Sequence, residues 1–154
     1  MTTRVWLAAL GGLVLSVPAG AGGLDTKAQL VGGTLAGCAA KSNVRINLTG
    51  TETLVVVCGG TEFRVPYRKI DTLEYGQNVS RRYAAAVLLS PVLLLSKSRK
   101  HYVTLGYVDP NGNQQVMVLR VDKGDIRSVL AGLEARTGLR VEYQDDEARQ
   151  SGKG

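Results

Sequence analysis

The chain has few of the residues from which reactive centres are built. It contains one histidine, two cysteines, one tryptophan and four prolines among 154 residues, and only 5% of its residues are aromatic. A metal site or a nucleophilic triad needs several reactive side chains close together, so this composition argues against both. The sequence therefore predicts no catalytic residue, no metal, no cofactor and no small-molecule substrate, and we expect a protein that is not an enzyme.

The chain also lacks the compositional extremes of disordered and fibrous proteins. Its hydrophobic share is 44% and its charged share is 21%, both close to the globular average. Nineteen glycines indicate turns and bulges. The length suits one domain with a hydrophobic core. We expect this single domain to occupy residues 22–143.

The N-terminal segment, residues 1–21, has the pattern of a signal peptide. Arg4 supplies a positive charge, residues 5–17 are uncharged and mostly apolar, and Ala19–Ala21 offers small residues to a signal peptidase. An uncleaved membrane anchor is the alternative, because residues 5–24 carry no charge. The pattern favours cleavage after Ala21 and an exported protein, periplasmic or secreted.

Export changes the interpretation of the two cysteines, Cys38 and Cys58. In an oxidising compartment an even number of cysteines favours a disulfide. Two buried free thiols are the alternative, because free cysteine is often buried. Residues 35–38 also match a bacterial lipobox, but charged residues separate them from the apolar N-terminal stretch, which argues against a lipid anchor.

The central part of the chain has the periodicity of short strands. Residues 44–48 alternate between apolar and polar, and residues 53–58 form a β-branched run that ends before two glycines. Residues 63–67 alternate again. Asp109–Gly112 is a strong turn signal and predicts a hairpin that joins residues 101–108 to residues 114–121. We expect about seven short strands.

The period changes near the C-terminus. From Asp125, apolar residues recur at the spacing of an amphipathic helix, and Gly138 suits the position that follows the last helical turn. Residues 139–143 predict a further short strand, and we expect residues 144–154 to be a disordered polar tail. The apolar stripe consists of Ile126, Val129, Leu130 and Leu133.

Seven short strands followed by one amphipathic helix resemble the pleckstrin-homology fold and its GRAM-like relatives. The resemblance is one of element order over roughly residues 28–138, and it includes LTGTETLVVV at 48–57 and FRVPYRKIDTLEYG at 63–76. It implies a small barrel capped by the C-terminal helix. The Tyr-Gly and His-Tyr stretches are also similar to a family of secreted bacterial proteins for which no activity is implied. Fold does not decide function, so no lipid specificity is carried over.

An apolar segment separates the two halves of the predicted sheet in the sequence. Residues 84–95 read AAAVLLSPVLLL, without a charge, and cations flank both ends. Twelve helical residues reach about 18 Å, short of the roughly 30 Å of a bilayer core, so the segment cannot span a membrane alone but could enter one surface. The candidate contact residues are Arg81, Arg82, Leu88, Leu89, Val92, Leu93, Leu94, Leu95, Lys97, Arg99 and Lys100.

The basic character of the chain is concentrated around this segment. Residues 64–100 contain eight cations and two acids, which gives this segment a net charge of +6. The net charge of the whole chain is also +6. We expect an exported binding protein that contacts an envelope membrane surface or an envelope partner. The alternatives are a secreted scaffold in which residues 84–95 are buried without membrane contact, and a protein interface. No zinc spacing, helix-turn-helix or RNA-binding motif supports nucleic-acid binding.

Overall fold

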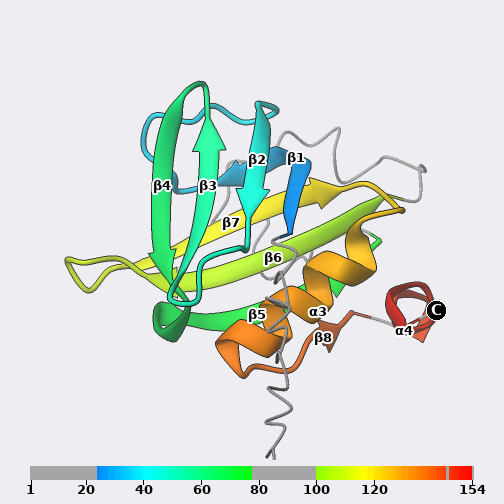
Figure 1. Ribbon diagram of the computed structural model, residues 1–154. Coiled ribbons are helices and arrows are strands. Elements are labelled where there is room, and N and C mark those ends of the chain that lie inside the picture. The colour runs from blue at the N-terminus through cyan, green and yellow to red at the C-terminus, as the bar shows by residue number, and fades with distance from the viewer. Residues whose placement is uncertain (1–23, 78–99, 145, 154) are drawn as a thin grey trace, which may run out of the picture.

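The computed structural model describes residues 24–77, 100–144 and 146–153, and these residues form one curved sheet with helices packed against it (Figure 1). The strands are β1 (Asp25–Gly33), β2 (Asn43–Asn47), β3 (Thr53–Cys58), β4 (Thr61–Pro66), β5 (Ile70–Gly76), β6 (His101–Val108), β7 (Gln114–Val121) and β8 (Glu142–Tyr143). A short 3-10 helix, η1 (Tyr67–Lys69), joins β4 to β5, and the helices α3 (Ile126–Thr137) and α4 (Asp146–Lys153) follow the sheet.

The described strands form one eight-stranded sheet in the order β4-β3-β2-β1-β7-β6-β5-β8. The first seven strands pair in antiparallel fashion, and the two-residue β8 is parallel to β5. A mainly β fold with a C-terminal helix is thus confirmed. The sheet is not closed into a barrel, because β4 and β8 are its two edges and do not pair with each other.

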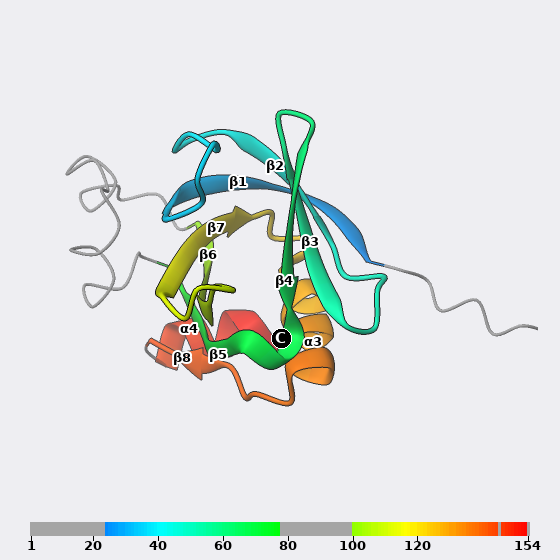
Figure 2. The ribbon, with the colours of Figure 1, turned by 90° about the vertical axis from the view of Figure 1, so that its left-hand side faces the viewer.

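One face of the sheet carries the core because apolar residues alternate along the strands. In β2, Val44 and Ile46 are buried while Arg45 is exposed, and β3 shows the same alternation. Helix α3 packs against this concave face (Figure 2). Its apolar stripe is fully inside the core, as the 3.6-residue period predicts. The buried residues of α3 are Ile126, Val129, Leu130 and Leu133.

The C-terminal end of α3 is fixed to the sheet by specific contacts. Gly138 ends the helix in a left-handed conformation (φ 73°), which glycine adopts without strain. The Arg136 guanidinium donates hydrogen bonds to the carbonyl oxygens of Thr49 (3.3 Å) and Gly50, in the β2–β3 connection. The same guanidinium lies 5.8 Å from the ring centroid of Tyr67. These contacts join α3 to η1 and to the β2–β3 connection.

The C-terminal tail differs from the sequence prediction. Residues 144–154 were expected to be disordered, but Asp146–Lys153 form helix α4. Ala148 is 0% exposed, and a Cβ on Gly152 would lie 2.6 Å from Cε1 of Tyr143. Two small residues one turn apart therefore let the helix approach the sheet closely. The polar composition hides this signal, because only the small residues face the core.

Two of the sequence predictions fall on residues outside the described ranges. They are the signal peptide at 1–21 and the apolar segment at 84–95. In the ranges that the structure does describe, no helix combines the length and apolar character needed to cross a membrane.

Candidate functional site

A continuous row of residues crosses the sheet from β5 to β2. Gly76 at the end of β5 pairs with Tyr102 at the start of β6, and Tyr102 pairs with Arg120 on β7. Arg120 pairs in turn with Gln29 on β1, and Gln29 pairs with Asn43 on β2. The segment that joins β5 to β6 therefore leaves and re-enters the sheet at one end of this row.

The other end of the row opens into a basic hollow on the sheet face that points away from α3. The hollow has a volume of about 480 Å³, and three cations line it: Lys27, Arg45 and Arg120. This volume falls within the range of small-ligand sites. The remaining lining residues are Ala28, Gln29, Asn43, Val44, Val57 and Asp122. We use "basic hollow" for this set of nine residues.

Strand alternation explains why the three cations share a face. Lys27 lies between the buried residues Thr26 and Ala28, and Arg120 lies between Leu119 and Val121. Because successive side chains of a strand point to opposite faces, burial of the neighbours turns each cation outward. The antiparallel register then places Lys27 opposite Arg45.

The basic hollow carries a net positive charge. Arg45 forms an ion pair with Asp25 at 3.6 Å, and both side chains are largely exposed. Across the described ranges, neither Lys27 nor Arg120 belongs to an ion pair. Exposed pairs of this kind contribute little to stability, so the cations are available to an anionic ligand. Burial raises the pKa of the neighbouring Tyr102 phenol, and the charge of Arg120 opposes that rise.

The single histidine takes part in a structural pair. The Tyr75 hydroxyl lies 2.5 Å from Nδ1 of His101, and Tyr75 is fully buried. The pKa of His101 is lowered, chiefly by burial and further by the nearby Lys123 ammonium. In the part of the chain that the structure covers, no group of three or more histidine, cysteine, aspartate or glutamate side chains could hold a metal ion.

The structure places one of the eleven predicted contact residues. Lys100 lies directly before β6 and is half-buried. The other ten lie outside the described residues: Arg81, Arg82, Leu88, Leu89, Val92, Leu93, Leu94, Leu95, Lys97 and Arg99.

A disulfide joins Cys38 to Cys58, with their Cα atoms 6.0 Å apart. It connects the loop after β1 to the end of β3. Of the two interpretations that the sequence left open, the structure contains the bridge rather than two free thiols.

Sequence reasoning missed the cations of the basic hollow. The alternation around Arg45 is visible in the sequence and indicates an outward side chain. The meeting of Lys27, Arg45 and Arg120 depends on β1 pairing with both β2 and β7. The pairing of β1 with β7 joins residues that are 84 to 93 positions apart, from Gly33 with Met117 to Ala28 with Val121. Single-strand periodicity carries no information about such a pairing. Comparison of the chain with protein-family models and with curated proteins found no match.

Proposed function

We propose that this protein is an exported, non-enzymatic binding protein that associates with the anionic surface of an envelope membrane. The cations of the basic hollow and those that flank residues 84–95 would form the contact. The observation that carries this proposal is the row of cross-strand pairs from Gly76 to Asn43. Because of this row, the basic hollow lies at the same end of the strands as Gly76, where the chain leaves β5 toward the basic segment.

The energetics of such a contact suit several separated cations. Each lysine or arginine near an anionic membrane contributes about 1 kcal/mol, and salt screens the attraction. Lys27 and Arg120 supply charges without a described acidic partner, and Lys100 adds another where the segment joins β6. The attraction would therefore be cumulative and sensitive to ionic strength.

The disulfide supports export. Disulfides persist in oxidising compartments such as the periplasm and the extracellular space, and they are rare in the cytosol. The bridge between Cys38 and Cys58 is thus consistent with a cleaved signal peptide at residues 1–21. We propose a periplasmic or secreted location, with peripheral attachment to the membrane.

We further propose a pleckstrin-homology-like architecture for the domain. The strand order is that of an antiparallel meander interrupted once, between β4 and β5, with β1 and β7 paired. The short helix η1 bridges the interruption, and α3 is attached there through Arg136 and Tyr67. This arrangement supports an open relative of the small barrel rather than a closed one.

A second candidate is a secreted scaffold in which residues 84–95 are buried and no membrane is bound. The burial of Thr104 and Val118 favours it, because these two residues pair with each other and their strand neighbours lie in the core on the other face of the sheet. The two candidates differ in whether the cations bind an anionic surface.

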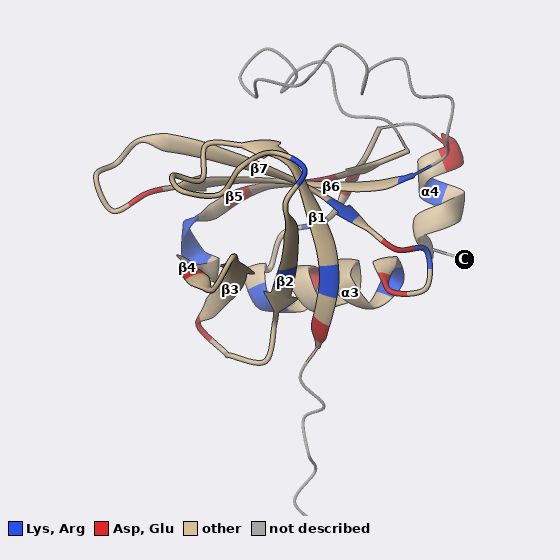
Figure 3. Ribbon diagram, turned by 90° about the horizontal axis from the view of Figure 1, so that it is seen from above, with Lys and Arg blue, Asp and Glu red and all other residues tan. Residues whose placement is uncertain are grey.

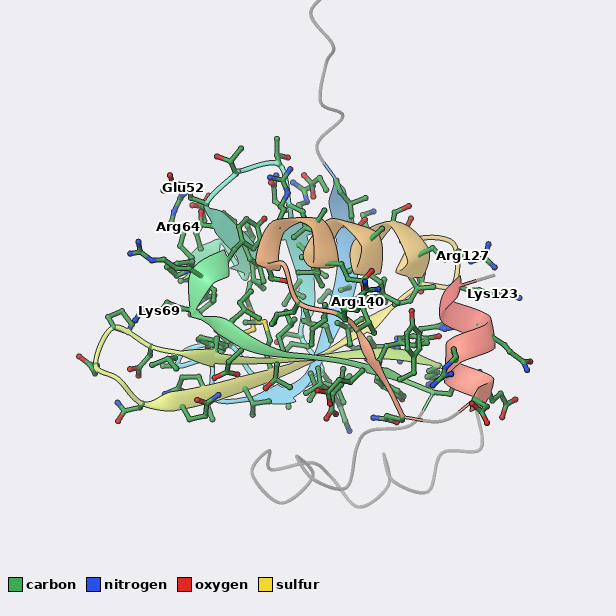
Figure 4. The ribbon with its side chains drawn as sticks, turned by 90° about the horizontal axis from the view of Figure 1, so that it is seen from below. Glu52, Arg64, Lys69, Lys123, Arg127 and Arg140 are labelled. Atoms are coloured by element: carbon green, nitrogen blue, oxygen red, sulfur yellow. A yellow bond between two sulfur atoms is a disulfide. The ribbon has the colours of Figure 1, made fainter. Side chains whose placement is uncertain are left out.

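Vesicle co-sedimentation of the mature protein tests the proposal. The first variant replaces Lys27, Arg45 and Arg120 with glutamine. A matched control replaces Lys69, Arg127 and Arg140, which are exposed and lie on the side of the molecule that carries α3 (Figure 4). Both variants lose three charges, but only the first should lose binding to anionic vesicles at low salt.

Variants of the flanking segment complete the test. Glutamine at Arg81, Arg82, Lys97, Arg99 and Lys100 should weaken binding most at low ionic strength. Failure of the parent protein to bind anionic vesicles at low salt would exclude the membrane and favour the scaffold. Equal weakening by the two triple variants would show that net charge, and not the basic hollow, determines binding.

A further inference from the structure

A second pocket lies between α3 and the elements that follow it in the chain. Its volume is about 200 Å³, and none of its lining residues belongs to the basic hollow. Figure 3 shows α3 and α4 as neighbouring helices, with basic residues on both. The pocket walls include Arg127, Leu130 and Glu134 of α3, Arg140 and Val141 of the connection to β8, and Tyr143 of β8. We call it the arginine pocket.

The floor of the arginine pocket is apolar. Leu130 and Val141 are 3% and 7% exposed, and both belong to the core cluster. Gly152 of α4 also lines the pocket and is buried, because a Cβ at this position would lie 2.6 Å from Cε1 of Tyr143. Part of any ligand in the pocket would therefore contact hydrocarbon.

Two exposed arginines line the same pocket from different elements. Arg127 is in the first turn of α3, and Arg140 is in the connection between α3 and β8 (Figure 4). Within residues 24–77, 100–144 and 146–153, neither arginine belongs to an ion pair. A guanidinium offers a planar fork of donors that matches the two oxygens of a carboxylate. An anion in the pocket would thus meet two such groups.

The one acid among the lining residues has a structural role. Oε1 of Glu134 accepts a hydrogen bond from the backbone N–H of Val141 at 2.8 Å, and this bond holds the connection against α3. A further cation acts on the pocket wall. Burial raises the pKa of the Tyr143 phenol, the Glu134 carboxylate raises it further, and the charge of Arg149 on α4 lowers it. Three arginines in or beside the pocket thus outnumber one carboxylate, and the net charge favours an anionic ligand.

We propose that the arginine pocket binds a short-chain organic carboxylate. Arg127 and Arg140 would bind the carboxylate group, while the alkyl chain would lie against Leu130 and Val141. The volume limits the ligand, because a water molecule occupies about 30 Å³ in the liquid and 200 Å³ therefore holds about seven groups of that size. Butyrate and its neighbours in the chain-length series are of this size.

The apolar floor is the reason to choose a carboxylate with an alkyl chain over an inorganic anion. Phosphate or sulfate would also contact the arginines, but it would leave Leu130 and Val141 without a ligand contact. The proposal is independent of the membrane contact, since the basic hollow lies on the other face of the sheet and shares no residue with the arginine pocket. It can be tested without lipid.

NMR titration of the isotope-labelled protein with the series from acetate to hexanoate tests the role of the alkyl chain. The dissociation constant should fall about fourfold for each added CH₂ until the pocket is full, and then level off. Butanol, which has no charge, and inorganic phosphate, which has no alkyl chain, should each bind about tenfold more weakly than butyrate. Absence of saturable binding, or phosphate binding as tight as that of butyrate, would overturn the inference.

The two charge variants of the vesicle experiment locate the site, with their roles exchanged. The glutamine variant of Lys69, Arg127 and Arg140 should lose butyrate binding, and the glutamine variant of the three cations of the basic hollow should keep it. Equal loss in both variants would overturn the inference, because net charge would then explain the binding. A parent protein that binds butyrate but no vesicle would refute the membrane contact alone.

A further variant fills the pocket and keeps every charge. Ala131 is exposed on α3 and lines the pocket, so Ala131→Leu introduces bulk there, and leucine suits a helix nearly as well as alanine does. Ser128→Leu is the matched control, because Ser128 is exposed on the same helix outside the pocket. Ala131→Leu should weaken butyrate binding about tenfold, and Ser128→Leu should leave it unchanged. Unchanged binding in a folded Ala131→Leu protein would overturn the inference.

Discussion

The Tyr75 hydroxyl and the His101 imidazole form a hydrogen-bonded pair at 2.5 Å, with their rings nearly parallel and 6.0 Å apart. The pair joins the end of β5 to the start of β6, and Tyr143 of β8 packs edge-on against Tyr75. Three strands are thus connected at the point where the segment 78–99 leaves the sheet.

The pair predicts that folding stability depends on pH. Burial, and then the charge of Lys123, hold the pKa of His101 below its ordinary value of 6.5. The unfolded chain therefore binds a proton at a higher pH than the folded protein does. Stability should be full above about pH 6.5 and should fall as the pH decreases toward the lower folded pKa.

Urea unfolding between pH 5 and pH 8 measures this dependence, and His101→Gln should flatten it. The chain has one histidine, so its imidazole NMR signals give the folded pKa without ambiguity. A folded pKa at or above 6.5 would contradict the prediction.

The second prediction concerns the attachment of α3. Leu133 is 1% exposed and lies in the core, so Leu133→Ala should lower the free energy of unfolding by about 2–5 kcal/mol. Ser128→Ala, on the exposed face of the same helix, should change it by less than about 0.5 kcal/mol. Urea unfolding compares the two. A small effect at Leu133 would mean that α3 does not pack on the sheet in solution.

The third prediction concerns the disulfide. Cys38 and Cys58 enclose a sequence separation of 20 residues. Loss of a disulfide over a loop of this size should lower the free energy of unfolding by about 3 kcal/mol, because the unfolded chain is then less constrained. Cys38→Ser with Cys58→Ser should show this loss in urea unfolding. Thiol titration of the unfolded, non-reduced protein should find no free thiol, and two free thiols would exclude the bridge.

The fourth prediction concerns Arg136. Its guanidinium donates hydrogen bonds to the carbonyl oxygens of Thr49 and Gly50 and lies over the Tyr67 ring. Because both hydrogen bonds are exposed to solvent, we expect the contacts together to contribute about 1–2 kcal/mol. Arg136→Met should therefore lower the free energy of unfolding. Arg136→Lys should lower it by a smaller amount, because lysine keeps the charge but lacks the planar guanidinium that donates to two carbonyl oxygens. Absence of any change in urea unfolding would contradict this role.

The same substitution has a spectroscopic consequence at Tyr67. Burial raises the pKa of the Tyr67 phenol, while the Arg136 charge opposes the rise. Arg136→Met removes that opposition, so the pKa of Tyr67 should increase further. Ultraviolet titration of the phenols, with Tyr67→Phe to identify the signal, measures the shift.

Local periodicity was sufficient to predict most of the elements. Alternation at Val44 and Ile46 and the stripe ending at Leu133 identified β2 and α3, because each pattern lies within one element. Gly138 was placed correctly as the end of α3 for the same reason. The pairing of β1 with β7, which builds the basic hollow, joins distant segments and leaves no such local pattern.

Helix α4 was missed for a different physical reason. Its residues are almost all polar, and sequence reasoning associates such a composition with disorder. The helix packs through Ala148 and Gly152, whose contribution lies in their small size rather than their hydrophobicity. Small residues on a polar helix become informative only when the large side chains opposite, here Tyr75 and Tyr143, are known.

The two edge strands of the sheet, β4 and β8, carry features that oppose association with other chains. An unpaired strand edge can template association with other chains. On β4, Pro66 has no N–H to donate, and the ion pair between Arg64 and Glu62 at 2.6 Å places charges along the strand. At the other edge, β8 is only two residues long. These features oppose edge-to-edge aggregation at β4 and leave only a short strand at the other edge, although the sheet does not close into a barrel.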